Sequence, residues 1–403
     1  MTFLLFITLS TSNLLRPEVQ AFIHAHEQDD VVQLVLQGHQ YPDIPIKAVA
    51  AQIQARQKAK HKFPDWYQQA GVIFPPTLSV EQASSEITAR YKASLMRGKH
   101  LVDLSGGMGI DTYYLSQSFQ YTDYVEQQEA LVALAAHNFQ TLGQSQIKTH
   151  HSTAEEFLEK LSSKAECLYL DPARRDEQKR KVFRLEDCTP NVVALRDVLL
   201  DKGKKVLIKT APLLDIHAAL EELSHVEKVV VIAVNQDCKE VLYLLDREME
   251  GETQMETIHF LHDSVQNFVF SRSQEERAEV TYAEPLSYLY EPNATILKAG
   301  AFKAIAEAFQ MHKLHPNSHL YTSNELQSHF PGRIFRIKEV SKYHKKSLKA
   351  LIPSGKANIT TRNFPDSVQQ IRKKTGIKEG GDTYIFATTA QDNKNILLIT
   401  EKI

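Results

Sequence analysis

Two short polar segments, each directly after an apolar run, contain the residues best suited to bind a ligand and to act on it. The first reads Asp103-Leu104-Ser105-Gly106-Gly107-Met108-Gly109. Its glycines, Gly106, Gly107 and Gly109, let the main chain turn sharply and approach a ligand with no Cβ in the way. A glycine turn that joins a buried strand to a helix is typical of nucleotide sites, and it places Asp103 at the carboxyl end of the strand.

The second segment is the turn Asp171-Pro172-Ala173-Arg174-Arg175, which comes after the apolar residues 167–170. Asp171 has the chemistry of a general base, or of a hydrogen-bond acceptor that aligns a substrate amine or hydroxyl. Arg174 and Arg175 are suited to clamp a phosphate. In the alternative interpretation Asp171 and Pro172 only shape the turn, and the two arginines pair with the acidic residues 176 and 177.

Further candidate residues come after the next two strand-like runs. Glu126 ends the run 121–127, about twenty residues past the glycines, where an acid can accept hydrogen bonds from two ribose hydroxyls. The alternative for Glu126 is an ordinary solvated acid at a strand end. Thr153 and Ala154 begin a helical segment after the run 146–152, where they can border an adenine ring. These positions predict a site for a nucleotide-type ligand.

The elements that must position these residues alternate between strands and helices. Apolar, β-rich runs lie at 100–104, 121–127, 146–152, 167–170, 204–212, 227–234 and 239–246, and helical patterns separate most of them. The gap between the last two runs is only four residues, which is too short for a crossover helix. These two strands are therefore expected to be antiparallel neighbours.

From Lys99 to Arg247 this order resembles the class I S-adenosylmethionine-dependent methyltransferases, whose strand–helix alternations close with an antiparallel hairpin. In that family the first strand ends in Asp-x-Gly-x-Gly-x-Gly. Gly107 and Gly109 match this pattern, whereas Ser105 replaces the first glycine and Gly106 comes one place late. A nicotinamide dehydrogenase requires Gly-x-Gly-x-x-Gly, and residues 110–112 offer no such glycine.

The resemblance implies a Rossmann-like α/β fold with a seven-stranded sheet and S-adenosylmethionine as the cofactor. It places the methionine moiety against Asp103 and the turn 105–109, the ribose against Glu126, and the adenine edge against Thr153 and Ala154. Asp171, Pro172 and Arg174 would then face the transferred methyl group as candidate catalytic residues.

The residues after Asp171 argue against two well-known base chemistries. Enzymes of the family that methylate exocyclic base amines have Asp-Pro-Pro-Tyr or Asn-Pro-Pro-Tyr here, and Ala173-Arg174 replaces the Pro-Tyr that would stack on the base. The turn looks more like the Asp-Pro-Pro-Arg of RNA 5-methyluridine methyltransferases. Those enzymes also need a nucleophilic cysteine after the fifth strand, where this chain has Lys209-Thr210-Ala211-Pro212.

Length and composition predict a soluble protein of several domains, since 42% of the 403 residues are hydrophobic and 24% are charged. Three widely spaced cysteines indicate a reducing cytoplasm, and no spacing predicts a metal site. The apolar residues 1–10 are too few to span a membrane, so no membrane partner is expected. The predicted regions are a helical region at 1–97, the methyltransferase domain at 98–248, a small α+β module at 249–332 and a C-terminal α+β domain at 333–403.

Two segments of the helical region bear on function. Residues 54–63 carry four basic side chains before Trp66 and Tyr67, which suits either a nucleic-acid contact or a solvated helix end beside a core tryptophan. Gln82-Ala83-Ser84-Ser85 is similar to a segment that precedes the first strand in RNA cytosine-5 methyltransferases. Ser84 is therefore expected to cap the next helix, within reach of the cofactor.

The C-terminal domain is strongly basic. Residues 333–403 carry 15 Lys and Arg against 6 Asp and Glu, a net of +9, while the remainder carries 32 against 43, a net of −11. Its β-α-β-α-β-β pattern resembles a THUMP-like domain, the RNA-binding module of several RNA-modifying enzymes. The alternative is a basic surface that only aids solubility. Besides Arg175, the expected RNA contacts are Lys345, Lys346, Lys349, Arg372, Lys373 and Lys374.

Together these features predict a cytoplasmic methyltransferase that uses S-adenosylmethionine to modify a nucleotide in structured RNA, such as tRNA or rRNA. Three alternatives stay open: a methyltransferase of a protein or small molecule, a non-catalytic RNA-binding protein that retains the fold, and a nicotinamide oxidoreductase. The oligomeric state is also open.

Overall fold

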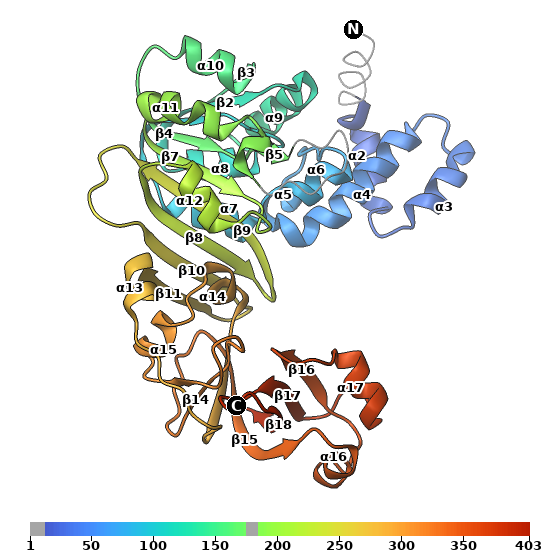
Figure 1. Cartoon of the computed structure of the whole chain (residues 1–403). Coiled ribbons are helices and arrows are strands. Elements are labelled where there is room, and N and C mark those ends of the chain that lie inside the picture. Colours follow the sequence, from blue (N-terminus) through green and yellow to red (C-terminus); the bar gives the residue numbers. More distant parts are fainter. Residues whose placement is uncertain (1–12, 175–183) are drawn as a thin grey trace. The chain divides into compact units, whose positions relative to one another are not determined.

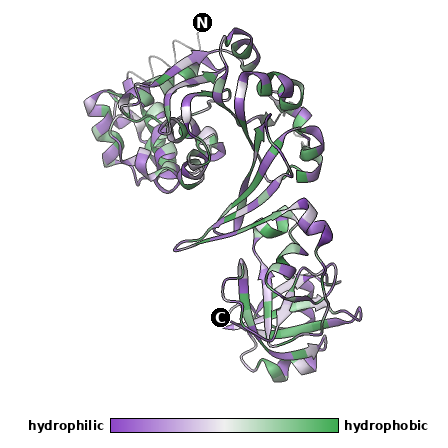
Figure 2. Ribbon diagram, turned by 90° about the vertical axis from the view of Figure 1, so that its left-hand side faces the viewer, coloured by the Kyte–Doolittle hydropathy of each residue, from purple (hydrophilic) through white to green (hydrophobic). Residues whose placement is uncertain are grey.

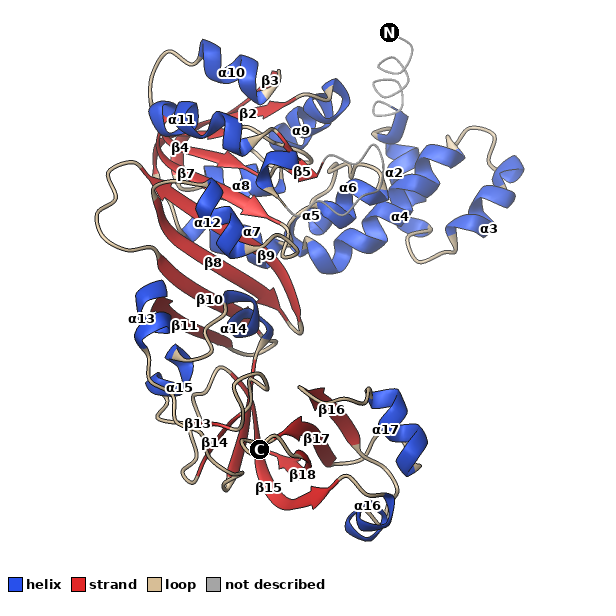
Figure 3. Cartoon of the chain, in the orientation of Figure 1, coloured by secondary structure: helices blue, strands red, loops and turns tan. Residues whose placement is uncertain are grey.

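The computed structural model describes residues 13–174 and 184–403 (Figure 1). It divides into two units, Met1–Val226 with Leu242–Met249 and Glu227–Val241 with Glu250–Ile403, and each is described by itself. The larger of its sheets has nine strands in the order β11-β10-β8-β9-β7-β4-β1-β2-β3 (Figure 3). This order contains the seven strands of the expected methyltransferase sheet, and two further strands extend it. The predicted Rossmann-like α/β fold is confirmed.

The first unit is built on parallel strands joined by crossover helices. Strand β1 pairs in parallel with both β2 and β4, and β4 pairs in parallel with β7. Because parallel strands point the same way, their carboxyl ends lie along one edge of the sheet, where ligands bind in open α/β folds. Its strands are β1(Gly98–Asp103), β2(Phe119–Glu126), β3(Ile147–His151), β4(Ala165–Leu170) and β7(Gly203–Thr210). The same sheet continues with β8(Val226–Val234), which lies in the second unit from its second residue on, and with β9(Asp237–Asp246), which passes from the second unit to the first at Leu242. The helices are α8(Ile110–Ser116), α9(Glu129–Thr141), α10(Ala154–Lys160), α11(Val192–Lys202) and α12(Ile216–Glu222).

The N-terminal helices share one apolar core with the first helices of the sheet. Phe63 and Trp66 are fully buried in a cluster that also contains Ile110, Tyr114 and Phe139 from α8 and α9. This shared core fixes the N-terminal helices beside the carboxyl end of β1. The helices are α2(Pro17–Ala25), α3(Val31–Leu36), η1(Gly38–Gln40), α4(Ile46–Lys62), α5(Pro64–Gln68), α6(Thr77–Gln82) and α7(Glu86–Ser94).

The basic residues 54–63 lie on α4 and are largely engaged within the protein. Arg56 is buried and donates from Nε to Glu27 Oε1 at 2.5 Å. Lys62 donates from Nζ to the carbonyl of Val80 at 2.9 Å. Since Trp66 is also buried, the structure agrees with a helix end beside a core tryptophan and gives no support to a nucleic-acid contact here.

The second unit contains a seven-stranded sheet in the order β13-β14-β12-β15-β18-β17-β16. Its last six elements run β15(Gly332–Lys342), α16(Lys345–Leu351), β16(Asn358–Arg362), α17(Val368–Thr375), β17(Thr383–Thr389) and β18(Asn395–Lys402), so the predicted β-α-β-α-β-β order is confirmed. Figure 2 shows hydrophobic residues along the strands, and leucine and isoleucine side chains form the core beneath α16 and α17.

Residues 249–332 contribute strands to both sheets. Strand β10 pairs with β8 and β11, whereas β12 pairs with β14 and β15. Residues 292–309 have an unbroken helical pattern in the sequence, which predicts one helix, but they form two helices because Gly300 ends the first of them with φ +76°. The elements are β10(Gln254–Phe260), β11(Val265–Ser271), α13(Arg272–Arg277), β12(Tyr288–Pro292), α14(Ala294–Ala299), α15(Ala304–Ala308), β13(His312–Lys313) and β14(Tyr321–Ser323). The domain limits at 97, 248 and 332 stay predictions.

Candidate functional site

A hollow of about 50 Å³ lies in the first unit, at the carboxyl ends of β1 and β4. This is the edge of the sheet where the sequence places the glycine turn and the Asp171 turn. The hollow is lined by residues before β1, by the turn after β1, by the first residues of α8 and by the end of β4. They are Ala83, Ser84, Asp103, Ser105, Gly106, Gly107, Met108, Gly109, Ile110, Asp111, Tyr169 and Asp171.

The three glycines of the turn have different roles. A Cβ on Gly106 would overlap the ring of Tyr124, and a Cβ on Gly109 would come within 2.7 Å of the ring of Phe139. Both glycines are therefore required by packing. Gly107 has φ +55°, and the nearest atom to a Cβ there would be the carbonyl oxygen of Ser105 at 3.8 Å. Gly107 is thus the glycine whose missing side chain leaves space for a ligand.

Glu126 fastens the glycine turn. Its Oε2 accepts a hydrogen bond from the Gly107 amide at 3.0 Å, and its Oε1 accepts one from the Gln128 amide at 2.8 Å. The Tyr124 hydroxyl donates to the Gly107 carbonyl at 2.6 Å, so both polar groups of the Gly107 backbone are held. Each carboxylate oxygen has two lone pairs, so Glu126 keeps the capacity to accept further hydrogen bonds. Its predicted contact with ribose hydroxyls stays a prediction.

Asp103 is buried at the end of β1. Its Oδ1 accepts from the Ser105 amide at 2.9 Å, and its Oδ2 accepts from the Thr112 hydroxyl at 2.6 Å. Burial, together with the nearby charges of Asp111 and Asp171, raises the pKa of Asp103 to about 7 despite these hydrogen bonds. The described residues supply no cationic partner for this carboxyl group. A cation brought by a ligand would provide that partner.

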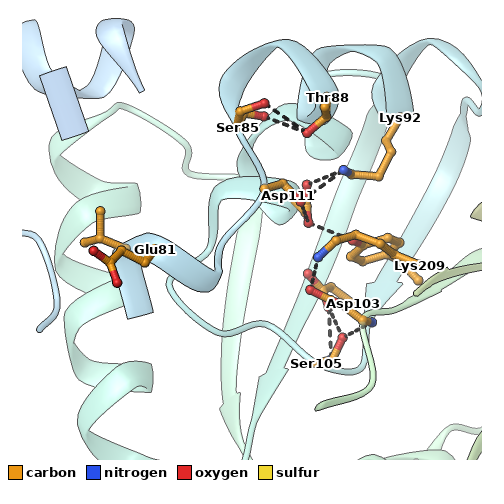
Figure 4. Close-up of polar contacts among 12 residues, drawn as sticks. Glu81, Ser85, Thr88, Lys92, Asp103, Ser105, Asp111 and Lys209 are labelled. Atoms are coloured by element: carbon orange, nitrogen blue, oxygen red, sulfur yellow. Dashed lines mark hydrogen bonds and ion pairs between the residues drawn. The ribbon is translucent and has the colours of Figure 1, made fainter. Parts of the chain in front are cut away.

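Asp111, which the sequence did not single out, is held by a buried network (Figure 4). Its Oδ1 lies 3.2 Å from the ammonium of Lys92, which is fully buried on α7. Its Oδ2 accepts from Ser84 Oγ at 2.8 Å and from the Tyr169 hydroxyl at 2.7 Å. Burial opposes ionisation of Asp111, but the charges of Lys92 and Lys209 outweigh it and lower its pKa. The sequence contained one signal for this network. Lys92 falls on the same helix face as Thr88 and Ala89, and this face of α7 is buried.

Asp171 lies opposite the glycine turn and is fixed at two points. Its amide donates to the Ser105 hydroxyl at 2.6 Å, and its Oδ2 accepts from the ammonium of Lys209 at the end of β7. Ser105 thereby joins the two turns, which explains why a hydroxyl side chain can replace the usual glycine here. The sequence predicted both turns but neither this tether nor the role of Lys209.

Several predicted residues lie elsewhere or cannot be placed. Thr153 caps α10 by accepting from the Glu156 amide at 3.2 Å, and neither it nor the buried Ala154 lines the hollow. Pro172 is buried, and the backbone of Arg174 belongs to the short strand β5(Ala173–Arg174), which pairs with β6(Cys188–Thr189). The Arg174 side chain and all of Arg175 lie outside the described residues.

The prediction that Ser84 caps a helix was wrong. The residue at the N-cap of α7 is Ser85, whose hydroxyl lies 3.3 Å from the Thr88 hydroxyl. The Ser84 hydroxyl instead donates to Asp111 and accepts from Lys92, so it belongs to the hollow.

In the second unit the predicted basic residues divide into two groups. Lys345, Lys346, Lys349 and Lys373 are exposed, and no described acidic side chain forms an ion pair with them. In contrast, Lys374 pairs with Asp366 at 2.6 Å. Arg372 is half-buried and donates to the backbone carbonyls of residues 357 and 377, so its side chain helps to hold these two segments of the domain together.

Two classes of site are absent from the described parts of the chain. Residues 13–174 and 184–403 contain no group of three or more histidine, cysteine or acidic side chains arranged to hold a metal ion. Within the same residues, every helix is too short or too polar to cross a membrane.

Family models match two segments in the C-terminal part of this chain, and a solved structure matches nearly all of it. Family models match residues 288–331 as a ferredoxin-like domain and residues 332–402 as THUMP domain-like. A solved structure from Porphyromonas gingivalis W83, named "putative methyltransferase", is 31% identical, covers 96% of this chain and 97% of its own, and has a TM-score of 0.86.

Two other similar structures each cover about two fifths of the chain. An rRNA methylase from Streptococcus thermophilus is 14% identical over 41% of this chain and 97% of its own, with a TM-score of 0.29. M. capricolum TrmK in complex with S-adenosylhomocysteine is 14% identical over 40% of this chain and 68% of its own, with a TM-score of 0.32. No curated protein sequence matches the chain.

Proposed function

The chain belongs to the family of class I S-adenosylmethionine-dependent methyltransferases with a C-terminal THUMP-like domain, and from this premise we propose that it methylates a nucleotide in structured RNA. The methyl donor would be S-adenosylmethionine and the substrate a tRNA or rRNA. The observation that carries the proposal is the hollow beside Gly107, which is lined by a glycine with room around its Cα and by Asp103, a carboxyl group with no cationic partner among the described residues.

The charges around the hollow fit the methyl donor. Asp111 and Asp171 each have a lysine partner, in Lys92 and Lys209, whereas Asp103 has no cationic partner among the described residues. The methionine moiety of the donor carries an ammonium group and a sulfonium, and either would stabilise ionised Asp103. When bound, the donor supplies a methyl group that is already activated, so the protein has to position the acceptor and take up a proton.

The basic surface of the THUMP-like domain supports RNA as the substrate. Lys345, Lys346 and Lys349 project from one short helix, and Lys373 lies on α17. Exposed lysines without acidic partners are free to neutralise phosphates and release counterions. Double-stranded RNA is recognised largely through its backbone and shape, which such a surface can provide without reading bases.

Mass spectrometry of nucleosides tests the proposal directly. Total tRNA and rRNA from a strain that lacks the gene should miss one methylated nucleoside, and a plasmid copy of the wild-type gene should restore it. Purified protein should also methylate RNA from the deletion strain with radiolabelled S-adenosylmethionine. The proposal fails if the protein binds the donor by calorimetry but labels a protein or small-molecule fraction and leaves RNA unlabelled.

A further inference from the structure

Taking the proposed methyl transfer as given, we propose that the Ser105 hydroxyl is a positioning group that couples donor binding to the Asp171 turn, so that the acceptor RNA binds the donor-loaded protein more tightly than the empty protein. A chain of hydrogen bonds that joins the two sides of the hollow carries this coupling. The coupling deepens the proposed function, because it gives the two substrates a preferred order of binding.

Ser105 contacts both sides of the hollow at once. Its amide donates to Asp103 Oδ1 at 2.9 Å, and its hydroxyl donates to the same oxygen at 3.5 Å (Figure 4). The same hydroxyl accepts from the Asp171 amide at 2.6 Å. Three groups are therefore linked in series: the Asp171 amide, the Ser105 hydroxyl and the Asp103 carboxyl group.

The Asp103 end of this series responds to a bound donor. Asp103 lines the hollow and has no cationic partner among the described residues. Burial raises its pKa to about 7, so a cation that binds beside it increases the fraction that is ionised. An ionised carboxylate is a stronger hydrogen-bond acceptor than a neutral carboxyl group. The ammonium group of the donor is thus expected to strengthen the bond from the Ser105 hydroxyl, which at 3.5 Å is long.

A stronger bond at Asp103 also strengthens the bond at Asp171. A hydroxyl that donates a hydrogen bond becomes a better acceptor, because consecutive hydrogen bonds polarise each other. The Ser105 hydroxyl therefore holds the Asp171 amide more firmly when the donor is bound. In this way a charge on one side of the hollow fixes the backbone on the other side.

The position of the Asp171 backbone determines where the acceptor turn lies. Pro172 comes next, with a fixed φ and no N–H, and it restricts Asp171 to extended backbone. Pro172 is also buried, and the two residues after it pair with the strand Cys188–Thr189. The described part of the turn thus has little freedom of its own, so holding the Asp171 amide holds the surface that would receive the acceptor.

The residue that the methyltransferase family has at this position could not make the link. That family has glycine where this chain has Ser105, and glycine has no side chain to accept from the Asp171 amide. Ser105→Gly is therefore one substitution for the test. Ser105→Ala is the second, because it removes the hydroxyl without adding the backbone freedom of glycine. Both should have the same effect if the hydroxyl is the cause.

Binding measurements quantify the coupling. Total tRNA and rRNA from a deletion strain should bind wild type about 3- to 10-fold more tightly when S-adenosylhomocysteine, which keeps the ammonium group, is saturating. By reciprocity, RNA should raise the calorimetric affinity for S-adenosylhomocysteine by the same factor. Both factors should fall to about 1 in Ser105→Ala and Ser105→Gly, while affinity for S-adenosylhomocysteine alone stays within about threefold. Ser105→Thr, which keeps the hydroxyl, should restore the coupling.

Asn191→Ala is the matched control for these variants. Asn191 Oδ1 accepts from the Ala194 amide at 3.0 Å at the start of α11, so this change also removes a side-chain acceptor from a backbone amide of the first unit. Asn191→Ala should lose some stability in urea denaturation and keep the whole coupling. A coupling that falls equally in Asn191→Ala and Ser105→Ala would show general destabilisation and overturn the role of Ser105.

Hydrogen exchange tests the link without RNA. S-adenosylhomocysteine should slow exchange of the Asp171 amide by at least about threefold in wild type and leave it unchanged in Ser105→Ala. Mass spectrometry with electron-transfer fragmentation follows this single amide. If its exchange in wild type does not respond to S-adenosylhomocysteine, the coupling is overturned whatever the substrate is.

The outcomes separate the coupling from the proposed function. Wild type that methylates RNA but binds it equally well with and without S-adenosylhomocysteine overturns the coupling and leaves the function standing. Slowed exchange at Asp171 in a wild type that methylates no RNA keeps the link and overturns the function. A coupling that survives in both Ser105→Ala and Ser105→Gly overturns the role of the hydroxyl.

Discussion

Gly107 offers a substitution that separates ligand binding from folding. A Cβ there meets no atom within 3.8 Å, whereas at Gly106 or Gly109 it would strike a ring. Gly107→Ala should therefore fold, with a loss of about 1 kcal/mol because φ is positive. Affinity for S-adenosylmethionine should fall at least about 100-fold, since the methyl group occupies ligand space.

Gly143→Ala is the matched control for this substitution. Gly143 has φ +71° and no atom within 4 Å of its would-be Cβ, so it carries the same backbone strain away from the hollow. Calorimetry should find wild-type affinity for Gly143→Ala, and urea denaturation should give the two variants similar stabilities. Equal affinities of both variants would show that the donor does not lie against Gly107.

Asp103 predicts a dependence of stability on pH. Burial raises its pKa from the ordinary 3.8 to about 7, so the folded state binds this proton more tightly than the unfolded state. The free energy of unfolding contributed by Asp103 is therefore highest below pH 4 and is lost as the pH rises through about 7. The loss is on the order of 4 kcal/mol, at about 1.4 kcal/mol per pH unit.

Urea denaturation at pH 5 and pH 8 checks this dependence. Wild type should lose more stability between the two values than Asp103→Asn, which has no proton to release at this site. The affinity for the donor should depend on pH in the opposite direction to the stability, because a cationic donor favours ionised Asp103. Affinity for S-adenosylmethionine should thus rise from pH 6 to pH 8 in wild type and stay flat in Asp103→Asn. Parallel pH profiles of the two proteins would refute the assignment.

At the scale of elements, the contact between α7 and α8 depends on a buried ion pair. Lys92 has no exposed surface and lies 3.2 Å from Asp111. Lys92→Met should destabilise the protein by about 3–5 kcal/mol, because it leaves Asp111 charged and buried without its main partner. Lys92→Met with Asp111→Asn should recover part of that loss in urea denaturation at pH 7. A double variant no more stable than the single one would show that the charge of Asp111 is not the cause.

The elements themselves were predictable because they depend on local pattern. Apolar runs indicated the strands, and the glycines marked where β1 turns into α8. The contacts that build the site were not predictable, since each joins residues far apart in the sequence: Ser105 with Asp171, Lys92 with Asp111, and Lys209 with Asp171. The break at Gly300 was missed because one glycine interrupts a helical pattern without erasing it.

At the scale of the whole molecule, the charge asymmetry predicts how RNA binding responds to salt. Replacing Lys345, Lys346 and Lys349 by alanine should weaken binding of bulk tRNA and reduce the slope of log K against log salt by up to about 3. Filter binding from 50 to 300 mM potassium chloride measures both effects.

Lys338 and Lys394 provide the control for the lysine substitutions. Each already forms an ion pair, with Glu401 and Asp392 respectively, so replacing them by alanine should change the salt slope little. If the triple variant keeps the wild-type slope, α16 does not meet the phosphates.

Ser84, from the helical segment that precedes β1, lines the hollow, and Lys92 of the same segment pairs with Asp111 in its wall. That segment shares its apolar core with α8 and α9. Residues 98–248 are therefore not expected to keep their activity when they are separated from the N-terminal helices. A chain that began at Gly98 would expose that core and leave Asp111 without its cation. The smallest piece of the chain that can keep this site therefore includes the N-terminal helices as well as the sheet.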